Sequence, residues 1–105
     1  MEIDMANAKE EFIDEIKDRV VKCVYLKHGS YCIPDRSFFL KIGHSGSDYS
    51  EFLNSIDFNY EDGYGTQELH GFIWYEDGTY SERGEYDGSE WWEHKSTPDI
   101  PNECI

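Results

Sequence analysis

The sequence of 105 residues is short of positive charge. It has 9 Lys and Arg residues against 23 Asp and Glu residues, a formal net charge of −14. Phosphate backbones and anionic membranes both require clustered basic side chains. The composition therefore argues against nucleic-acid and membrane binding and favours a basic protein partner, or a surface that only keeps the chain in solution.

Long apolar runs are also missing. No stretch reaches the length of a membrane span, and the start, MEIDMANAKEE, lacks the basic and apolar regions of a signal peptide. We therefore expect a cytoplasmic protein.

Cysteine is scarce and unpaired in the sequence. Cys23, Cys32 and Cys104 form no C-x-x-C motif, and their odd number argues against a disulfide framework. A zinc site normally draws its four ligands from close pairs, and no pair of the 4 histidines has such spacing. We expect reduced thiols, no metal and no other cofactor.

Aromatic residues, by contrast, make up 16% of the chain, more than disorder allows. They gather between Gly71 and Lys95, where the pairs Asp77-Gly78 and Asp87-Gly88 separate three short runs. Asp-Gly between such runs is typical of a two-residue hairpin turn. The pattern predicts a three-stranded antiparallel meander within residues 68–95.

Two-residue turns would fix the register of this meander. Tyr75 would then lie opposite Tyr80, and Gly84 opposite both Gly71 and Trp91. One face, which we expect to be the core, would carry Ile73, Tyr75, Tyr80, Tyr86 and Trp91. The other would carry Phe72, Trp74 and Trp92, with Arg83 stacked between Phe72 and Trp92 and paired with Glu85 or Glu90.

The first half predicts a helix and further strands. Phe12, Ile16 and Val20 recur every four residues, which indicates an amphipathic helix within residues 1–20, capped by Asn7 and Glu10. Residues 21–43 predict strands, with a turn at residues 28–30 and with Pro34 ending a strand or confining it to an edge. Residues 37–43 could continue the second strand or form a separate one.

A second helix is predicted at residues 48–56. Tyr49, Phe52, Leu53 and Ile56 have helical spacing, and Asp48 with Glu51 could form a capping box. Residues 96–105, with two prolines, predict an extended tail. The fold class is thus α+β in a single domain: an N-terminal helix on a four- to five-stranded antiparallel sheet that ends in the meander, with a short helix before the meander.

Residues from about Asp57 through Pro101 carry a recognisable motif. It comprises Asp57-Phe58, Tyr60, Gly63-Tyr64-Gly65, Gln67-Glu68-Leu69, Ile73-Trp74, Asp77-Gly78-Thr79, Glu82-Arg83, Glu85 through Trp92 and Ile100-Pro101. This motif resembles one found in small uncharacterised proteins of tailed bacteriophages, although Tyr80 stands where that pattern often has Trp. The resemblance implies a phage-encoded protein made in an infected bacterium, and it implies no particular activity.

Carboxylate catalysis is one interpretation of the acidic residues. Glu68, Glu82, Glu85 or Glu90 could supply a glycosidase-type pair among the aromatic rings, but a chain this acidic places some carboxylates close together by chance. No phosphate loop or nucleophile motif supports an enzyme. A small enzyme or ligand-sequestering protein that uses an aromatic cleft is therefore the alternative, and an oligomeric structural component is a third possibility.

Protein binding is the preferred interpretation. Residues 43–105 hold 15 acidic residues against two basic ones, Arg83 and Lys95, and carboxylates on a rigid meander can imitate the spacing of phosphates. We expect a non-enzymatic inhibitor that binds a basic groove of a host protein, such as a defence nuclease, as a DNA mimic. The expected contact residues are Glu61, Asp62, Glu85, Asp87, Glu90 and Glu93, with Trp92 as an apolar anchor.

Overall fold

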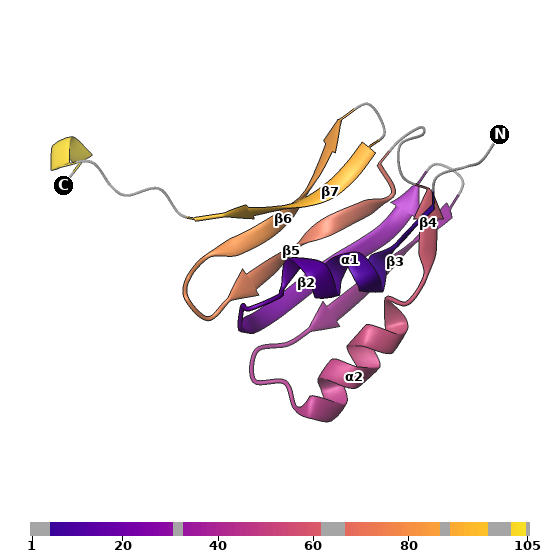
Figure 1. Cartoon of the computed structure of the whole chain (residues 1–105), viewed down its shortest axis with the longest axis horizontal. Helices are drawn as coiled ribbons and strands as arrows, with labels where there is room; N and C mark the ends of the chain where they lie inside the picture. The colour runs from indigo at the N-terminus through magenta and orange to yellow at the C-terminus, as the bar shows by residue number, and fades with distance from the viewer. Residues whose placement is uncertain (1–4, 31–32, 62–66, 87–88, 97–101, 105) are drawn as a thin grey trace.

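A five-stranded antiparallel sheet organises the computed structural model of the protein (Figure 1). The structure describes residues 5–30, 33–61, 67–86, 89–96 and 102–104. In chain order the elements are β1 (Met5–Asn7), α1 (Ala8–Glu15), β2 (Val21–Ser30), β3 (Ile33–Leu40), α2 (Gly46–Ser55), β4 (Asn59–Glu61), β5 (Leu69–Tyr75), β6 (Tyr80–Tyr86), β7 (Ser89–Lys95) and a 3-10 turn (Asn102–Cys104). The strand order β3-β2-β5-β6-β7 confirms the predicted α+β class and the terminal meander.

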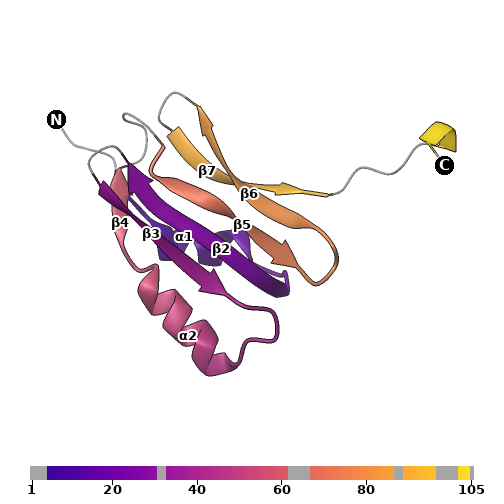
Figure 2. The same ribbon diagram turned by 180° about the vertical axis from the view of Figure 1, so that it is seen from behind.

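Both helices contribute to one core. In Figure 1, α1 lies in front of the sheet and α2 lies beside the edge strand β3, whereas Figure 2 shows the opposite face of the sheet. The rings of Phe12 on α1 and Phe52 on α2 meet edge to face at 5.4 Å. The core comprises Ala8, Phe12, Val24, Leu26, Leu40, Phe52, Ile56, Tyr60, Leu69, Ile73 and Tyr75.

Helix α1 begins as predicted but ends early. The Asn7 side chain accepts a hydrogen bond from the backbone N–H of Glu10 at 2.9 Å, which confirms the N-cap. Ile16 caps the C-terminus, and Asp18 has a positive φ of 64°, so the helix cannot continue to Val20. Val20 is consequently 69% exposed, and the expectation that it extends the buried stripe was wrong.

Helix α2 has a capping box that starts three residues earlier than predicted. Ser45 is the N-cap, and its side chain accepts from the N–H of Asp48 at 3.1 Å. The Asp48 carboxylate accepts in return from the N–H of Ser45 at 3.0 Å. Asp48 is therefore the third helical residue rather than the cap, and Glu51 has no part in the box.

The N-terminal hairpin is longer than predicted. Strand β2 runs through to Ser30, so residues 28–30 are not the turn, although the register shifts between His28 and Ser30. Strand β3 continues without a break from Ile33 to Leu40. Pro34 lies on this edge strand, as expected, because an edge position tolerates a residue without an N–H.

The turn between β5 and β6 has three residues instead of two. The N–H of Tyr75 donates to the carbonyl of Thr79 at 3.0 Å, and Gly78 has φ of 87°. This geometry is that of a hairpin whose third loop residue is a left-handed glycine. Trp74 rather than Tyr75 therefore pairs with Tyr80, a shift of one residue from the predicted register.

That shift reverses the predicted faces of β6 and β7. Ile73 and Tyr75 are buried as expected, but Tyr80, Tyr86 and Trp91 lie on the opposite face because successive side chains alternate. Between β6 and β7 the prediction was correct, since Gly84 pairs with Trp91. The core face of these strands instead carries Ser81, Arg83, Glu90 and Trp92.

Two further features fall outside the predicted scheme. Strands β1 and β4 form a small antiparallel sheet that sequence analysis missed. In the predicted tail, Asn102–Cys104 forms a 3-10 turn rather than extended chain. Residues 97–101 and 105 lie outside the described part.

Candidate functional site

The expected acidic contact surface does not form as predicted. Glu85 and Glu90 do pair directly across β6 and β7, but Glu90 is 3% exposed. Glu93 lies on the other face of β7, because it is three residues from Glu90. Glu90 is thus wrong as a surface contact, and the set is divided between two faces of the sheet.

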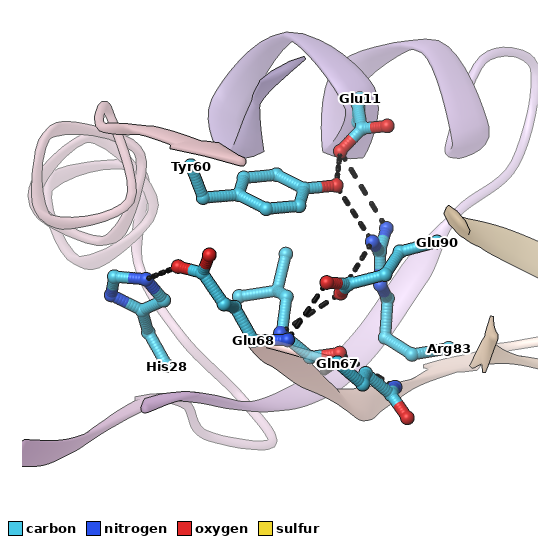
Figure 3. A network of polar contacts seen from close by, with 8 residues as sticks. Glu11, His28, Tyr60, Gln67, Glu68, Arg83 and Glu90 are labelled. Atoms are coloured by element: carbon cyan, nitrogen blue, oxygen red, sulfur yellow. Dashed lines mark hydrogen bonds and ion pairs between the residues drawn. The ribbon is translucent and has the colours of Figure 1, made fainter. Parts of the chain in front are cut away.

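Glu90 instead joins β7 to the start of β5. Its carboxylate accepts hydrogen bonds from the backbone N–H groups of Glu68 at 2.7 Å and of Leu69 at 2.9 Å (Figure 3). The β5–β6 pairing extends only from Trp74 to Phe72 on β5, so the N–H of Leu69 has no partner residue on β6 within the described register. The Glu90 side chain replaces that strand pairing.

Arg83 balances this buried carboxylate. Its side chain is 1% exposed, and Nη2 lies 3.4 Å from Glu90 Oε1. The guanidinium also lies over the Trp92 ring, 5.2 Å from the centroid. The predicted partners Trp92 and Glu90 are therefore confirmed, while Phe72 is wrong because it lies on the opposite face.

Tyr60 extends the network to α1. Arg83 Nη2 donates to the Tyr60 hydroxyl at 2.7 Å, and that hydroxyl donates to the Glu11 carboxylate. Glu11 also pairs with Arg83 Nη1 at 3.6 Å. Burial raises the pKa of the Tyr60 hydroxyl, so the phenol stays protonated and acts as a donor to Glu11.

His28 and Glu68 form a neighbouring pair. His28 Nε2 lies 3.2 Å from Glu68 Oε1, both side chains are nearly buried, and the His28 ring stacks on Phe58 at 4.4 Å. Figure 3 shows this pair beside the Glu90 carboxylate. Sequence analysis did not assign His28, Tyr60 and Glu11 to this network. They lie on β2, β4 and α1, and the sequence does not show that these elements meet.

The buried network suits a structural role better than a chemical one. Burial raises the pKa of Glu90, and the N–H groups of Glu68 and Leu69 and the Arg83 charge oppose this shift. Such a residue could act as an acid only if a substrate reached it, and Arg83 and Glu90 are 8% and 3% exposed. The network holds α1, β4 and the start of β5 against the part of the β6–β7 hairpin that no longer pairs with β5.

The remaining predicted contact residues are differently placed. Trp92 is half-buried against the core, so it does not lie on the face where the predicted register placed it, and its role as an apolar anchor stays a prediction. Glu85 is exposed, and Glu93 is partly exposed with its pKa lowered because the Trp91 indole donates to it at 2.8 Å. Glu61 ends β4, and nothing of its side chain is described. Asp62 and Asp87 lie outside the described residues.

The face of the sheet opposite α1 presents aromatic rings instead. We call it the outer aromatic face; its residues are Tyr25, Phe39, Phe72, Trp74, Tyr80, Tyr86 and Trp91. Tyr25 pairs with both Phe39 and Phe72, so three rings follow one another across β3, β2 and β5. Tyr25 stacks on Phe39 at 5.2 Å, and Phe72 stacks on Trp74 at 5.6 Å.

Several of these rings are open to solvent. Phe39 is 64% exposed, and Phe72, Trp74 and Trp91 are each close to 40%. Trp91 covers Gly84, where a Cβ would come within 2.8 Å of the indole nitrogen. Exposed apolar rings grouped on one face suit an interaction site.

Charged residues border the rings on β6 and β7. Lys95 pairs with Glu82 and, at 3.5 Å, with Glu93, and the bond with Glu82 raises the pKa of Lys95. On β2 and β3, at the opposite edge of the same face, Lys27 pairs with Asp35 at 3.4 Å. Lys27 and Lys95 are thus both paired with carboxylates.

Within the described residues, no group of three or more His, Cys, Asp and Glu side chains could hold a metal ion. Cys23 is a free thiol whose pKa is raised by burial. Nothing is described of the side chains of Cys32 and Cys104. The absence of a metal or cofactor stays a prediction.

Comparison with known proteins gave no relative. No family model, curated protein or solved structure matches the chain. Among the described helices, none is long and apolar enough to cross a membrane.

Proposed function

We propose that this protein is a non-enzymatic binding protein that attaches to a basic protein partner through the outer aromatic face. The observation that carries the proposal is the uneven covering of the sheet. α1 covers one face, where Phe52 of α2 joins the same core. Phe72, Trp74 and Trp91 remain exposed on the other face. Trp and Tyr are the residues that most often dominate the binding energy of protein interfaces.

A protein partner fits these rings better than a nucleic acid. Aromatic residues on a sheet can stack on bases, but such platforms need basic residues beside the rings to hold the phosphates. Here Lys27 and Lys95 are both paired with carboxylates, and the chain carries a charge of −14. Phosphates would be repelled.

Charge also favours a different protein over a second copy. Two copies would each bring a charge of −14 to a shared interface, whereas a basic surface would be attracted. The phage origin and the host nuclease target stay predictions. DNA mimicry through the originally expected carboxylates is not part of this proposal, because Glu90 is buried and Glu93 lies on the other face from Glu85.

Crosslinking from this face, followed by truncation of one ring, tests the proposal. A photoactivatable aromatic residue in place of Trp74 should crosslink to a basic protein in a lysate of the source cells, and the same residue at Ile13 on α1, which is apolar and 44% exposed, should not. With the captured protein purified, Trp74→Ala should weaken binding about 30-fold, the size of an interface hot spot. Equal crosslinking from both positions, or full-strength binding by Trp74→Ala, would contradict the proposal.

One observation favours the alternative of a small ligand. A pocket of about 210 Å³ lies between α1 and β7, lined by Glu11, Asp14, Glu15, Trp91 and Trp92. Carboxylates of α1 beside the Trp92 ring, which lies on the same face of the sheet, suit an organic cation. Titration with choline and with arginine, followed by tryptophan fluorescence, tests it: saturable binding lost in Asp14→Asn supports a small ligand, and no change in fluorescence rejects these cations.

A further inference from the structure

A second candidate site lies along the open edge of the sheet. A groove of about 610 Å³ separates β3 from α2. Its lining residues are Ser37, Phe38, Phe39, Leu40 and Lys41 from β3 and the residue after it, and Asp48, Glu51, Phe52 and Ser55 from α2. Successive strand residues point to opposite faces, so a groove that touches five in a row follows the edge of the strand rather than one face.

The backbone at this edge is open to pairing. Strand β3 stands at the end of the sheet order and pairs with β2 in the described structure. Such an edge presents a row of N–H and C=O groups to which an extended chain can add.

The register identifies which groups face the groove. The N–H of Gly29 donates to Glu68, beside β5, so odd-numbered residues of β2 direct their polar groups to β5 and even-numbered ones to β3. Leu26, which is opposite Phe38, then bonds to it. By the same alternation the N–H and C=O groups of Ser37 and Phe39 point away from β2, toward the groove.

The helix wall of the groove is acidic. Asp48 and Glu51 are both exposed on α2, and the buried Phe52 adds apolar surface to the lining. Lys41 is the single base among the groove residues. A segment with basic side chains complements this wall, and a second copy of the chain would bring its own carboxylates and its charge of −14.

We propose that the groove between β3 and α2 binds an extended, basic peptide segment, which adds a strand to β3 through Ser37 and Phe39 and places basic side chains against Asp48 and Glu51. The groove adjoins the proposed binding surface and shares Phe39 with it, but the ring tested on that surface, Trp74, lies on β5 and does not line the groove. The two proposals therefore fail independently.

Selection from a random library of displayed nine-residue peptides tests this inference. The library is panned on the wild-type chain after depletion on Ser37→Pro, which lacks the outward N–H but keeps the side of β3 that bonds to β2. Enriched peptides should carry net positive charge. A synthetic enriched peptide should bind Ser37→Pro about tenfold more weakly, as expected for one lost hydrogen bond.

Two variants separate the backbone contact from other effects. Ser37→Ala removes the hydroxyl and keeps the N–H, so it should bind like the wild type. Glu51→Lys should weaken binding several-fold and should do so less at high salt. If Ser37→Pro fails to fold, depletion on Glu51→Lys and slowed amide exchange at Ser37 and Phe39 on peptide binding replace it.

Clear outcomes would overturn the proposal. These are the absence of any peptide that distinguishes the wild type from the depletion variant, enrichment of acidic peptides, and amide shifts confined to β5. Concentration-dependent dimerisation that protects the Ser37 and Phe39 amides without peptide would make a second copy the occupant, and the peptide proposal would be wrong.

Discussion

Arg83 is the residue on which the buried network depends, because it neutralises a carboxylate that has left water. Arg83→Ala would leave the buried Glu90 without its cation, and breaking such a pair typically costs about 3 to 5 kcal/mol. We expect a loss of this size in the free energy of unfolding, measured with urea. Lys27→Ala, at an exposed ion pair, is the control and should change the free energy by less than about 1 kcal/mol.

Replacing Arg83 and Glu90 together tests more directly whether Arg83 stabilises the fold by neutralising the buried carboxylate. Arg83→Met with Glu90→Leu removes both charges, so it should be less destabilising than Arg83→Ala alone, although the N–H groups of Glu68 and Leu69 lose their acceptor. If the double variant were as unstable as the sum of the single variants, the charges would not be coupled.

Gly71 is the second residue with a defined requirement. Its φ is 154°, and a Cβ there would lie 2.2 Å from the carbonyl oxygen of Tyr25. Gly71→Ala should therefore lower the free energy of unfolding by more than about 2 kcal/mol. Gly46→Ala is a matched control, because a Cβ at the first position of α2 meets nothing within 4 Å; a loss there as large as at Gly71 would contradict the steric explanation.

Among the elements, α2 has an N-terminus that depends on pH. The pKa of Asp48 is lowered from 3.8, mainly because the backbone N–H of Ser45 donates to its carboxylate. A carboxyl group whose pKa is lower in the folded state stabilises the folded protein fully when the pH is above its pKa in the unfolded state. This stabilisation is lost as the pH falls through its pKa in the folded state. Asp48→Ala should thus lower the Tm at pH 7, and the difference should vanish well below pH 3.8.

Ser50→Ala provides the comparison on the same helix. Ser50 is exposed and carries no carboxyl group, so any change in Tm caused by Ser50→Ala should be the same at pH 7 and in acid well below pH 3.8. Circular dichroism melts at both values suffice. A difference for Asp48→Ala that persisted in acid would show that the carboxylate is not what stabilises the helix start.

At the scale of elements the sequence predicted the strands of the five-stranded sheet but not how β5 and β6 align. Asp-Gly is compatible with turns of two or three residues, and the deciding interaction, Asp77 accepting from the N–H of Thr79 at 2.9 Å, is local detail that the pattern does not specify. A one-residue slip was enough to exchange Trp91 for Trp92 in the core. The helix end was missed for a similar reason, because the spacing of Val20 continues after the left-handed Asp18 has ended α1.

The candidate surfaces were less predictable than the fold. Acidic residues in a strand usually lie at the surface, and Glu90 departs from this rule because partners from β5 and β6 converge on it. Those contacts connect residues far apart in the sequence. Composition correctly predicted many exposed carboxylates, but it could not predict that the rings of Phe72 and Trp74 would remain uncovered.

For the molecule as a whole, charge should control how fast a basic partner is found. Glu85 and Glu93 are the members of the predicted contact set that the structure shows to be at least partly exposed. Glu85→Lys with Glu93→Lys should slow association several-fold at low salt and have little effect at 1 M salt, where the Debye length is about 3 Å. Stopped-flow fluorescence with the captured partner measures this. Glu10→Lys with Glu103→Lys is the charge-matched control at exposed positions outside the main sheet, and an equal slowing there would mean that net charge rather than location matters.

The bond from Glu90 to the start of β5 also has a consequence for the time at which the chain can fold during its synthesis. The carboxylate that satisfies the N–H of Glu68 lies 22 residues later in the chain. Until Glu90 has been synthesised and has left the ribosome, Arg83 cannot pair with it, and the N–H groups of Glu68 and Leu69 lack their acceptor. Folding should therefore begin with the β2–β3 hairpin and finish only after β7 emerges, and stalled nascent chains that stop before Glu90 should be digested by protease as readily as unfolded ones.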